Sequence, residues 1–521
     1  MQSLNPLRGG PTQPPTIDSD ETFPLHFLDN QMSPRELVLS QTLLFNSVLN
    51  ATKLHDGLVK LVSNGDWSKL GGRLRKQRDG LLELHVPREF TAERPAVLFS
   101  AKTLGMPVGE HPLAGRLPRA TAAAEGESPS LHPGSTEFKE LSIVPGWCTK
   151  QEDYLSRDDP VLGLRIIVFA DATIVSLTAP HVVAGALGFQ SIFLAWSAAL
   201  RDDGAAIPPL LGARQDVLDS IGGEEEGGEV QSTEPYILTP KEMTGLGMAK
   251  FASRLLWNVF WRPTVGSRSI CLPREFVSRL CEKCIQEAEA ARKDGKPVCL
   301  SDGDVLTAWT TSFVVRARGG TRPALAMDAV DLVGRVKSFR DAVDGVYVQN
   351  LAGGAFTDIG VDLAMNRPLG KVAQAIRASI QEQVTEEQIR AQLRRYKAIG
   401  LGQRDSLFGD PDAQLLIYSN WTKFDLFNAC NFGPAVVRSS ETETISSKNS
   451  SDDATAMTPP GKPVYMHCSS VEDSRFQRDC FVITGKDLRG NYWMTAFLYP
   501  EDFAPFEEYI EQTWEEIRSW S

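Results

Sequence analysis

One of the seven histidines stands in a context that suits proton transfer. His181 follows the strand-like apolar run 174–177 and precedes a turn of small residues at 182–188, after which apolar residues recur at helical spacing over 189–196. A strand would therefore deliver the imidazole to a turn, and a helix would leave from that turn. Because an imidazole accepts and returns protons near neutral pH, His181 is the candidate general base. On residue chemistry alone, a buried structural histidine explains the same pattern equally well.

Two other chemical patterns point away from catalysis. Cys281 and Cys284 form a C-x-x-C pair, but no second pair stands at metal-binding spacing, and the surrounding residues have the apolar spacing of an amphipathic helix. We therefore expect a structural role for the cysteines and no metal site. The chain contains no G-x-S-x-G motif, so a serine-hydrolase mechanism lacks its nucleophile.

The elements around His181 alternate between strands and helices, which predicts an α/β fold. Residues 163–177 are expected to form a hairpin that turns at 170–172 and leads to His181. Further strands are expected at 80–86, 267–272, 324–336, 415–418, 481–484 and 493–498, and helices at 36–62, 276–292, 305–316, 370–397 and 505–520.

Composition and charge exclude several classes of function. The 521 residues carry a net charge of −12, and basic residues are nowhere clustered as a phosphate-binding surface requires, so we expect no nucleic-acid partner. No apolar run approaches the roughly 18 residues that span a bilayer, and the first residues resemble no secretory signal. With eight scattered cysteines, these features predict a soluble protein of a reducing compartment, the cytoplasm.

The length predicts two domains joined by a crossover. We expect a flexible tail at 1–20, an N-terminal domain at 21–205 that carries His181, a crossover linker at 206–262 and a C-terminal domain at 263–521. The linker includes an acidic glycine-rich run and the aromatic stretch 246–262, which predicts a helix packed on the domain interface or, as the alternative, a helix on a membrane surface. Residues 439–460 are of low complexity.

Several motifs in a fixed order resemble the BAHD family of acyl-CoA-dependent acyltransferases, in particular its fungal secondary-metabolism branch. The resemblance covers nearly the whole chain. The family's H-x-x-x-D-G motif corresponds to residues 181–186, and its S-x-W and D-F-G-W-G motifs correspond to 419–421 and 431–435. Its other marks are matched by 70–74, 80–84, 304–309 and 347–350.

Three positions depart from the family's pattern. The motif aspartate is replaced by Gly185, and its usual arginine partner, in a strand of pattern D-x-R-x-R, is matched by Val333. Loss of both partners of a buried ion pair can be neutral, whereas loss of one strands a charge at a cost of roughly 3–5 kcal/mol, so the joint loss suggests a repaired turn. The D-F-G-W-G segment has become Asn431-Phe432-Gly433-Pro434-Ala435.

The resemblance implies a chloramphenicol acetyltransferase-like α/β fold, with two similar mixed-sheet domains and an active site in a tunnel between them. It implies transfer of an acyl group, with acetyl-CoA or another acyl-CoA as co-substrate, to a hydroxyl of a terpenoid or polyketide. It assigns general-base catalysis to His181, the motif turn to Gly185, and acyl-CoA binding to Ser419, Trp421, Asn431 and Gly433. No permanently bound cofactor and no metal are implied, and a monomer is expected.

Two alternatives stay open on the altered motifs. The chain could use the same cleft for a cyclisation, hydrolysis or dehydration of a metabolite. It could also be a non-catalytic binding or regulatory protein on an inherited scaffold.

Overall fold

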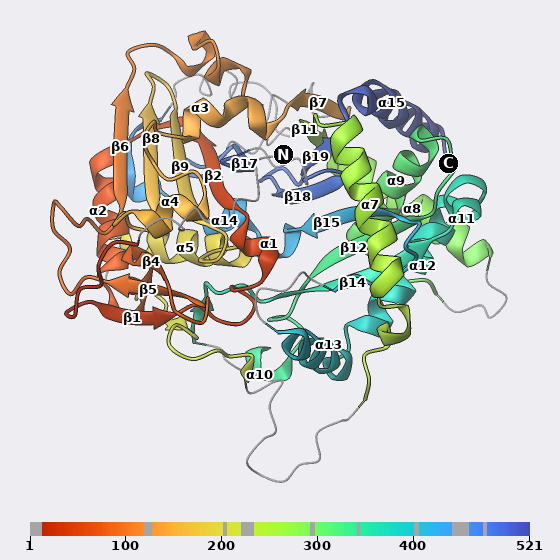
Figure 1. Cartoon of the computed structure of the whole chain (residues 1–521). Coiled ribbons are helices and arrows are strands. Elements are labelled where there is room, and N and C mark those ends of the chain that lie inside the picture. The colour runs from red at the N-terminus through yellow and green to blue at the C-terminus, as the bar shows by residue number, and fades with distance from the viewer. Residues whose placement is uncertain are drawn as a thin grey trace, which may run out of the picture.

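Two large mixed β-sheets stand side by side and enclose the site (Figure 1). The computed structural model describes residues 13–118, 128–201, 206–219, 234–291, 297–340, 344–400, 406–439, 458–472 and 477–520. Within these ranges, strands and helices alternate along most of the chain. The architecture is the expected α/β, chloramphenicol acetyltransferase-like arrangement.

The first large sheet carries the strand that ends at His181. Its strand order is β17-β2-β9-β8-β6, with bounds β2 Val38–Phe45, β6 Leu98–Thr103, β8 Gly163–Val168, β9 Thr173–Pro180 and β17 Tyr465–Ser470. Helices α2 (Ala51–Val62) and α5 (Ala186–Ala199) pack on each other, and the Trp196 indole N–H donates to the Leu54 carbonyl over 2.9 Å. The apolar residues of these strands and helices form one continuous core.

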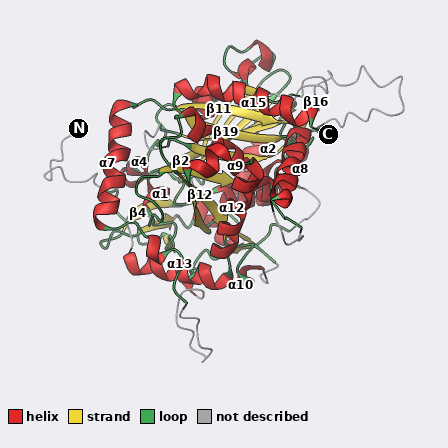
Figure 2. Ribbon diagram, turned by 90° about the vertical axis from the view of Figure 1, so that its right-hand side faces the viewer, coloured by secondary structure: helices red, strands yellow, loops and turns green. Residues whose placement is uncertain are grey.

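The second large sheet has seven strands, ordered β14-β12-β15-β18-β19-β11-β7. Their bounds are β7 Ser130–Pro133, β11 Gly266–Leu272, β12 Ala324–Asp331, β14 Ala352–Ile359, β15 Gln414–Asn420, β18 Cys480–Lys486 and β19 Tyr492–Leu498. The helices α8 (Arg274–Ala290), α9 (Asp302–Ala317), α12 (Leu369–Gln383) and α15 (Phe503–Ser519) share one core with this sheet (Figure 2).

The shorter elements connect or flank the two sheets. The strands are β1 Glu21–Pro24, β3 Ser47–Leu49, β4 Arg73–Lys76, β5 Leu82–Val86, β10 Leu210–Leu211, β13 Val346–Tyr347 and β16 Val436–Ser439. The helices are α1 Met32–Arg35, α3 Lys139–Ser142, α4 Gln151–Ser156, α7 Gly245–Trp261, α10 Lys337–Arg340, α11 Val361–Asn366, α13 Glu386–Ile399 and α14 Leu426–Ala429.

Each half of the chain lends one strand to the sheet of the other half. Strand β7 pairs with β11 at the edge of the C-terminal sheet, and β17 pairs with β2 along six residues at the edge of the N-terminal sheet. The two halves of the chain are therefore linked by main-chain hydrogen bonds within each sheet. Whether 21–205 and 263–521 are separate domains stays a prediction.

The exchanged strand β17 buries a neutral histidine. His467 is 1% exposed, its ring lies near Phe138 and Tyr465, and neither ring nitrogen has a hydrogen-bond partner among the residues that the structure describes. Burial lowers the pKa of His467 from 6.5 to about 4. The unfolded chain therefore binds a proton near pH 6.5 that the folded chain binds only near pH 4, so stability is lost as the pH falls through this interval.

We expect His467→Phe to reduce this acid sensitivity. Between pH 7 and pH 5 the wild-type protein should lose about 2 kcal/mol of unfolding free energy through this one group, and the variant should lose none through it. Urea unfolding at both pH values measures the difference. A matched substitution at the more exposed His55 should leave the loss unchanged, and equal losses in wild type and His467→Phe would contradict the assignment.

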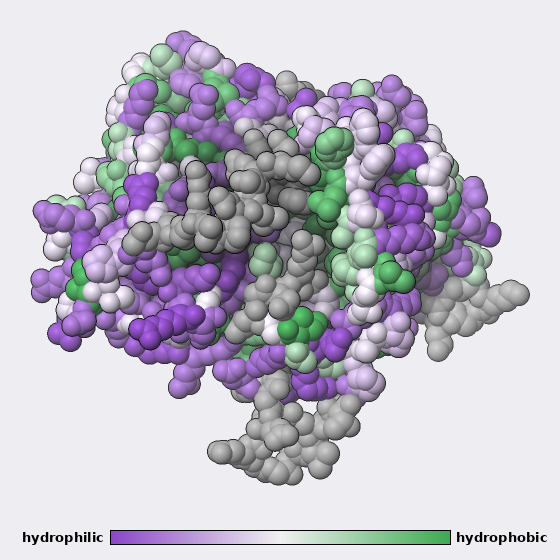
Figure 3. Space-filling view, in the orientation of Figure 1, coloured by the Kyte–Doolittle hydropathy of each residue, from purple (hydrophilic) through white to green (hydrophobic). Residues whose placement is uncertain are grey.

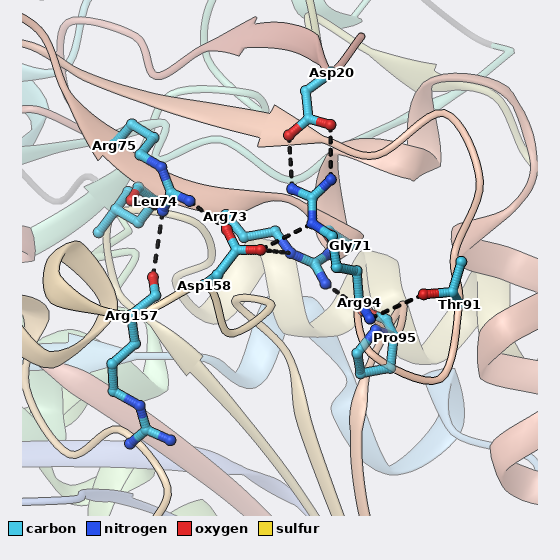
Figure 4. A network of polar contacts seen from close by, with 10 residues as sticks. All are labelled: Asp20, Gly71, Arg73, Leu74, Arg75, Thr91, Arg94, Pro95, Arg157 and Asp158. Atoms are coloured by element: carbon cyan, nitrogen blue, oxygen red, sulfur yellow. Dashed lines mark hydrogen bonds and ion pairs between the residues drawn. The ribbon is translucent and has the colours of Figure 1, made fainter. Parts of the chain in front are cut away.

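A small third sheet, β1-β5-β4, is fixed to the N-terminal half by a network of arginines (Figure 4). Asp158 faces Arg73, Arg75 and Arg94, with 2.8 Å from its Oδ2 to Arg94 Nε and 3.9 Å to Arg73 Nε. Arg94 also pairs with both carboxylate oxygens of Asp20 at 2.8 and 2.7 Å. Arg73 belongs to the GRL-like stretch, so that motif has a structural role here.

The segment expected as a flexible tail is anchored where the structure describes it. Residues 1–12 lie outside the described ranges. Gln13 exchanges two hydrogen bonds with the backbone of Lys76, and Asp20 pairs with Arg94. Residues 13–20 are therefore held at both ends. The low-complexity residues 440–457 also lie outside the described ranges.

Two element predictions were wrong in part. A helix was expected over 36–62, but residues 38–49 form strands β2 and β3 and the helix begins only at Ala51. A strand was expected over 324–336, but β12 ends at Asp331, whose carboxylate accepts from the backbone N–H groups of Val333 and Gly334. This Asp-centred turn stops the strand, because the carboxylate replaces the partner strand for those two amides. The expected helical region 370–397 is divided into α12 and α13 by a break at Val384 and Thr385. The remaining expected elements are confirmed within a few residues of their predicted bounds.

The aromatic helix α7 lies on the surface and not at an interface between the halves. Of its residues only Phe251 is buried, in a cluster of the C-terminal half. Leu256, Trp257, Phe260 and Trp261 are each at least 59% exposed and contribute to the apolar band seen in Figure 3.

Candidate active site

The end of β9 places His181 between the two halves of the molecule. Strand β9 pairs with β2 up to Pro180 and Val38, and the His181 N–H then donates to the Leu37 carbonyl over 2.9 Å. A tight turn follows, in which the Val183 N–H donates to the Pro180 carbonyl over 2.9 Å. Helix α5 begins directly after Gly185. The predicted strand, turn and helix around His181 are thus confirmed.

His181 lines a cavity of about 170 Å³ at the junction of the two halves. The N-terminal half contributes His181 and the start of α5, while the C-terminal half contributes residues from the ends of β12 and β15 and from the segments after β13 and β15. The lining residues from the C-terminal half include Ala329, Asp331, Gln349, Asn350, Ser419, Asn420, Trp421 and Phe424. A small molecule in this cavity would touch both halves and the imidazole together.

The surroundings of His181 favour its neutral form. The residue is half-buried, and its Nδ1 atom is buried without a hydrogen-bond partner among the described residues. Burial lowers the pKa of His181 from its ordinary value of 6.5, against the opposing effects of its own backbone carbonyl, the Asp29 carboxylate and the Asn350 side chain. A neutral imidazole can accept a proton, so the site is prepared for base catalysis at neutral pH.

This direction of the pKa shift predicts the acid limb of the pH profile. A base acts only when it is unprotonated, so activity falls as the pH falls through the pKa of His181. Because that pKa is depressed, half of the maximal kcat/KM should be retained at a pH below 6.5. A profile of kcat/KM between pH 4.5 and 8, in buffers of constant ionic strength, measures it, and an acid limb centred above 6.5 would be the contrary result.

The turn around Gly185 has no room for the family's aspartate. A Cβ atom at this position would lie 2.8 Å from Asn350 Oδ1 and 3.1 Å from His181 Cε1. Val333, the expected counterpart of the missing arginine, lies in the turn after β12, packs among apolar residues and does not line the cavity. Gly185 therefore lies at the motif turn, as expected, and Asn350 fills the space beside it.

Of the four residues expected to bind acyl-CoA, two lie at the cavity. Ser419 and Trp421 line it at the end of β15, and the Trp421 indole N–H donates to Ser419 Oγ over 2.7 Å. Asn431 and Gly433 do not line it.

The segment that contains Asn431 and Gly433 packs against α5 and does not reach the cavity. The Asn431 N–H donates to Ser197 Oγ on α5 over 2.8 Å. Phe432 is fully buried between Phe45 and Trp196, with ring centroids 5.4 and 4.5 Å apart. Phe432, which matches the family's motif as Gly433 does, therefore packs against α5, the helix that follows the His181 turn.

Several cavity residues were not predicted from the sequence. Gln349 and Asn350 were recognised only as part of a turn motif, and Asp331 only as part of a strand motif. Asp29, which contacts Asn350 but does not line the cavity, was not singled out. The position of Asn350 in the turn motif 347–350 was the one signal in the sequence that could have identified it as a site residue.

The cysteine pair shows no arrangement for metal. Cys281 and Cys284 are buried on α8, and the Cys281 thiol faces Asp302 at 3.7 Å. In the part of the chain that the structure describes, no three histidine, cysteine or acidic side chains are grouped as metal ligands. The helices of this part include none long and apolar enough to cross a membrane.

Comparisons with known proteins agree with this fold and site. The chain is 41% identical over 503 residues to the acetyltransferase pyiB of Pyricularia grisea, covering 96% of each chain. It is 34% identical to the O-acetyltransferase PaAT-2 of Phomopsis amygdali, covering 95% of this chain and 99% of that one. A protein of Penicillium decumbens named transcriptional regulator calD is 30% identical over 93% of this chain and 94% of its own. No family model matches.

A solved structure shows the same fold at low sequence identity. F. sporotrichioides TRI101, complexed with coenzyme A and T-2, superposes with a TM-score of 0.62 and 16% identity, covering 94% of this chain and 97% of that one.

The two mixed sheets with a histidine at their junction have the chloramphenicol acetyltransferase-like fold, and the relatives show that the chain is an acyltransferase. Within that class, the chain belongs to the BAHD family of acyl-CoA-dependent acyltransferases, in its fungal branch.

Proposed function

We propose that the protein is an O-acetyltransferase that moves an acetyl group from acetyl-CoA to a hydroxyl of a terpenoid or polyketide metabolite. The observation that carries this proposal is His181, kept neutral by burial, on the wall of a cavity between the two halves. The names of pyiB and PaAT-2 support acetyl transfer, and PaAT-2 supports an oxygen acceptor. The T-2 toxin in the TRI101 complex is an acceptor-like molecule beside coenzyme A, which supports the two-substrate site.

The mechanism follows from the positions of three side chains. Since Nδ1 of His181 is buried, Nε2 is the nitrogen that takes the hydroxyl proton while the hydroxyl oxygen attacks the thioester carbonyl. The tetrahedral oxyanion needs a donor. Ser419 Oγ accepts from the Trp421 indole N–H, so its own hydrogen is free to donate toward the cavity. The carbon–sulfur bond then breaks, and His181 returns the proton to the sulfur of coenzyme A.

Acetyl-CoA and the alcohol would meet at His181 from opposite sides of the junction. We assign Ser419 and Trp421 to the acyl-CoA side, and Asn431 and Gly433 to the segment that supports it through α5. The small volume of the cavity favours acetyl over long acyl chains.

The test is transfer itself. The purified protein is incubated with acetyl-CoA and a panel of hydroxylated terpenoids and polyketides, free thiol is followed with DTNB, and products are examined by mass spectrometry. We expect thiol release that depends on an alcohol, together with an acetylated product. Conversion of a panel member without thiol release would favour the cyclisation, hydrolysis or dehydration alternative and overturn the proposal.

The name of calD keeps a regulatory role as the second candidate. A regulator needs neither a neutral histidine nor a cavity beside it, whereas both are present here. No binding of acetyl-CoA, measured by calorimetry or by a change in Tm, together with no thiol release would favour the regulator.

The cytoplasm and a monomeric state complete the proposal. All eight cysteines lie in described ranges and are free, which suits a reducing compartment. Fluorescent tagging tests the location, and size-exclusion chromatography with light scattering tests the monomer.

A further inference from the structure

The turn that carries His181 lacks the carboxylate that the family places there, but another polar side chain forms a hydrogen bond with it. Asn350, in the segment after β13, crosses from the C-terminal half and donates from Nδ2 to the His181 carbonyl over 2.9 Å. The Asn350 side chain is thus the direct link between the C-terminal half and the backbone of the candidate base.

The hydrogen bonds of Asn350 fix which way its amide faces. Nδ2 donates to the His181 carbonyl and, over 2.8 Å, to Asp29 Oδ1. A carbonyl and a carboxylate only accept, so the NH₂ end must face both of them and the oxygen must face the other way. Oδ1 accordingly lies beside Gly185 and the imidazole, 2.8 Å from the point where a Cβ at Gly185 would be, while His181 Nδ1 lies 3.8 Å from that same point.

Asp29 holds Asn350 in this orientation. The carboxylate is 1% exposed, its Oδ1 accepts from both the backbone N–H and the side chain of Asn350 at 2.8 Å, and its Oδ2 accepts from the His26 N–H at 3.0 Å. A buried carboxylate is costly unless such donors surround it. Asp29 is therefore a buried acceptor for three N–H donors, two of which belong to Asn350.

We propose that Asn350, aligned by the buried carboxylate of Asp29, is the positioning residue that holds His181 in its reactive orientation at a turn that lacks the family's motif aspartate. The proposal rests on the function proposed above and names which residues of this chain prepare its base. The side chain that braces the turn comes from the opposite half of the molecule, where the family's aspartate would have come from the turn itself. Gly185 is then required because any side chain there would displace Asn350 Oδ1.

Loss of the contacts of Asn350 and Asp29 should lower kcat and leave substrate binding nearly unchanged. Neither Asn350 nor Asp29 takes up the proton, so their loss misplaces the imidazole without removing it, and small misplacements of reacting groups cost up to about 100-fold. We expect Asn350→Ala to lower kcat about 10- to 100-fold with KM for acetyl-CoA changed less than threefold. Asp29→Asn, which keeps the acceptor for Asn350 but loses the charge, should have a smaller effect of the same kind.

A matched control is Asn491→Ala. Asn491 donates from its side chain to Asp487 Oδ2 over 3.2 Å and is half-buried, but it does not line the cavity. The Asn491→Ala substitution removes an asparagine–aspartate contact of the same type and should leave kcat within twofold of wild type. Circular dichroism and urea unfolding establish that each variant is folded.

A measurement that needs no substrate separates this proposal from the proposed function. NMR with ¹³C-labelled histidine follows the His181 ring, identified as the resonance missing from His181→Ala. The charged groups near the ring are Asp29 behind the turn and Asp331 on the cavity wall. Since Asp29 and Asn350 both raise the pKa of His181, Asn350→Ala and Asp29→Asn should each lower it further, while Asn491→Ala should not. An unchanged pKa of His181 in a folded Asn350→Ala protein would overturn the positioning role of Asn350. This test needs no knowledge of the acyl acceptor.

A double-mutant cycle tests the contact between position 185 and Asn350. Gly185→Asp should lower kcat in the wild-type background, because its Cβ meets Asn350 Oδ1. In the Asn350→Ala background the space is open, so the same Gly185→Asp should cost less or restore activity. Additive losses would show that Asn350 does not fill the space beside Gly185.

Discussion

Replacing His181 with alanine is expected to lower kcat/KM for acetyl transfer by about 10²- to 10⁴-fold, the usual contribution of a positioned general base. The alcohol has a high pKa and attacks the thioester slowly unless its proton leaves during attack. His181 is the histidine that lines the cavity between the two halves, and the depressed pKa keeps it neutral at pH 7. DTNB detection of free coenzyme A, with the best acceptor from the panel, measures the loss.

The cavity of the His181→Ala protein should still bind coenzyme A, because the other lining residues are untouched. Calorimetry should therefore give a Kd within a few-fold of wild type, and the same substitution at His55, on α2, should leave kcat/KM unchanged. Acetyl transfer at the wild-type rate by His181→Ala would remove the histidine from the mechanism.

Replacing Asp158 with alanine is expected to destabilise the protein by about 3 kcal/mol, the lower end of the range for breaking a buried ion pair. Asp158 is the shared partner of Arg73, Arg75 and Arg94, and the Arg73 and Arg75 side chains are at most 5% exposed. Without the carboxylate, two guanidinium groups remain buried near each other, with backbone carbonyls as their remaining acceptors and less negative charge to balance them. Burial already lowers the pKa of Arg73 to about 10, which shows how poorly that site tolerates charge. Urea unfolding at pH 7 measures the loss.

The surface pair of Asp362 and Arg367 provides the control for Asp158. Both side chains are at least 59% exposed, so Asp362→Ala should cost much less than Asp158→Ala. Equal and small losses in the two variants would mean that the network around Asp158 is dispensable. Asp158→Asn keeps the size of the side chain but loses its charge, so its loss of unfolding free energy should lie between those of Asp158→Ala and Asp362→Ala.

The sequence was most informative where residue type and spacing act locally. The hairpin 163–177, the turn at His181 and helix α5 were all predicted, because alternating apolar residues, small residues and helical spacing each leave a local pattern. The strands β2 and β3 were missed because Leu37, Leu39, Leu43 and Leu44 also fit a helical spacing and helix α2 follows at once. Tertiary pairing with β9 and β17 decides the strand.

The brace of His181 could not be predicted, because its parts are distant in the chain. Asn350 contacts Asp29 across 321 residues and His181 across 169. No period or spacing connects such residues, and Asp29 stands in a stretch without a recognisable motif. The absence of the motif aspartate did predict that the turn had been repaired, but the repair uses an asparagine and a remote carboxylate, and Val333 takes no part in it.

The strand exchange has a consequence for how the protein is made. Strand β2 pairs with β9 on one side and with β17 on the other, and β17 begins only at Tyr465. On the ribosome, the sheet that ends at His181 therefore keeps one edge unpaired until almost nine-tenths of the chain has been translated. Until then the free edge of β2 is open to pairing with another nascent chain, so rapid completion of the chain or a chaperone bound to that edge would favour the native product.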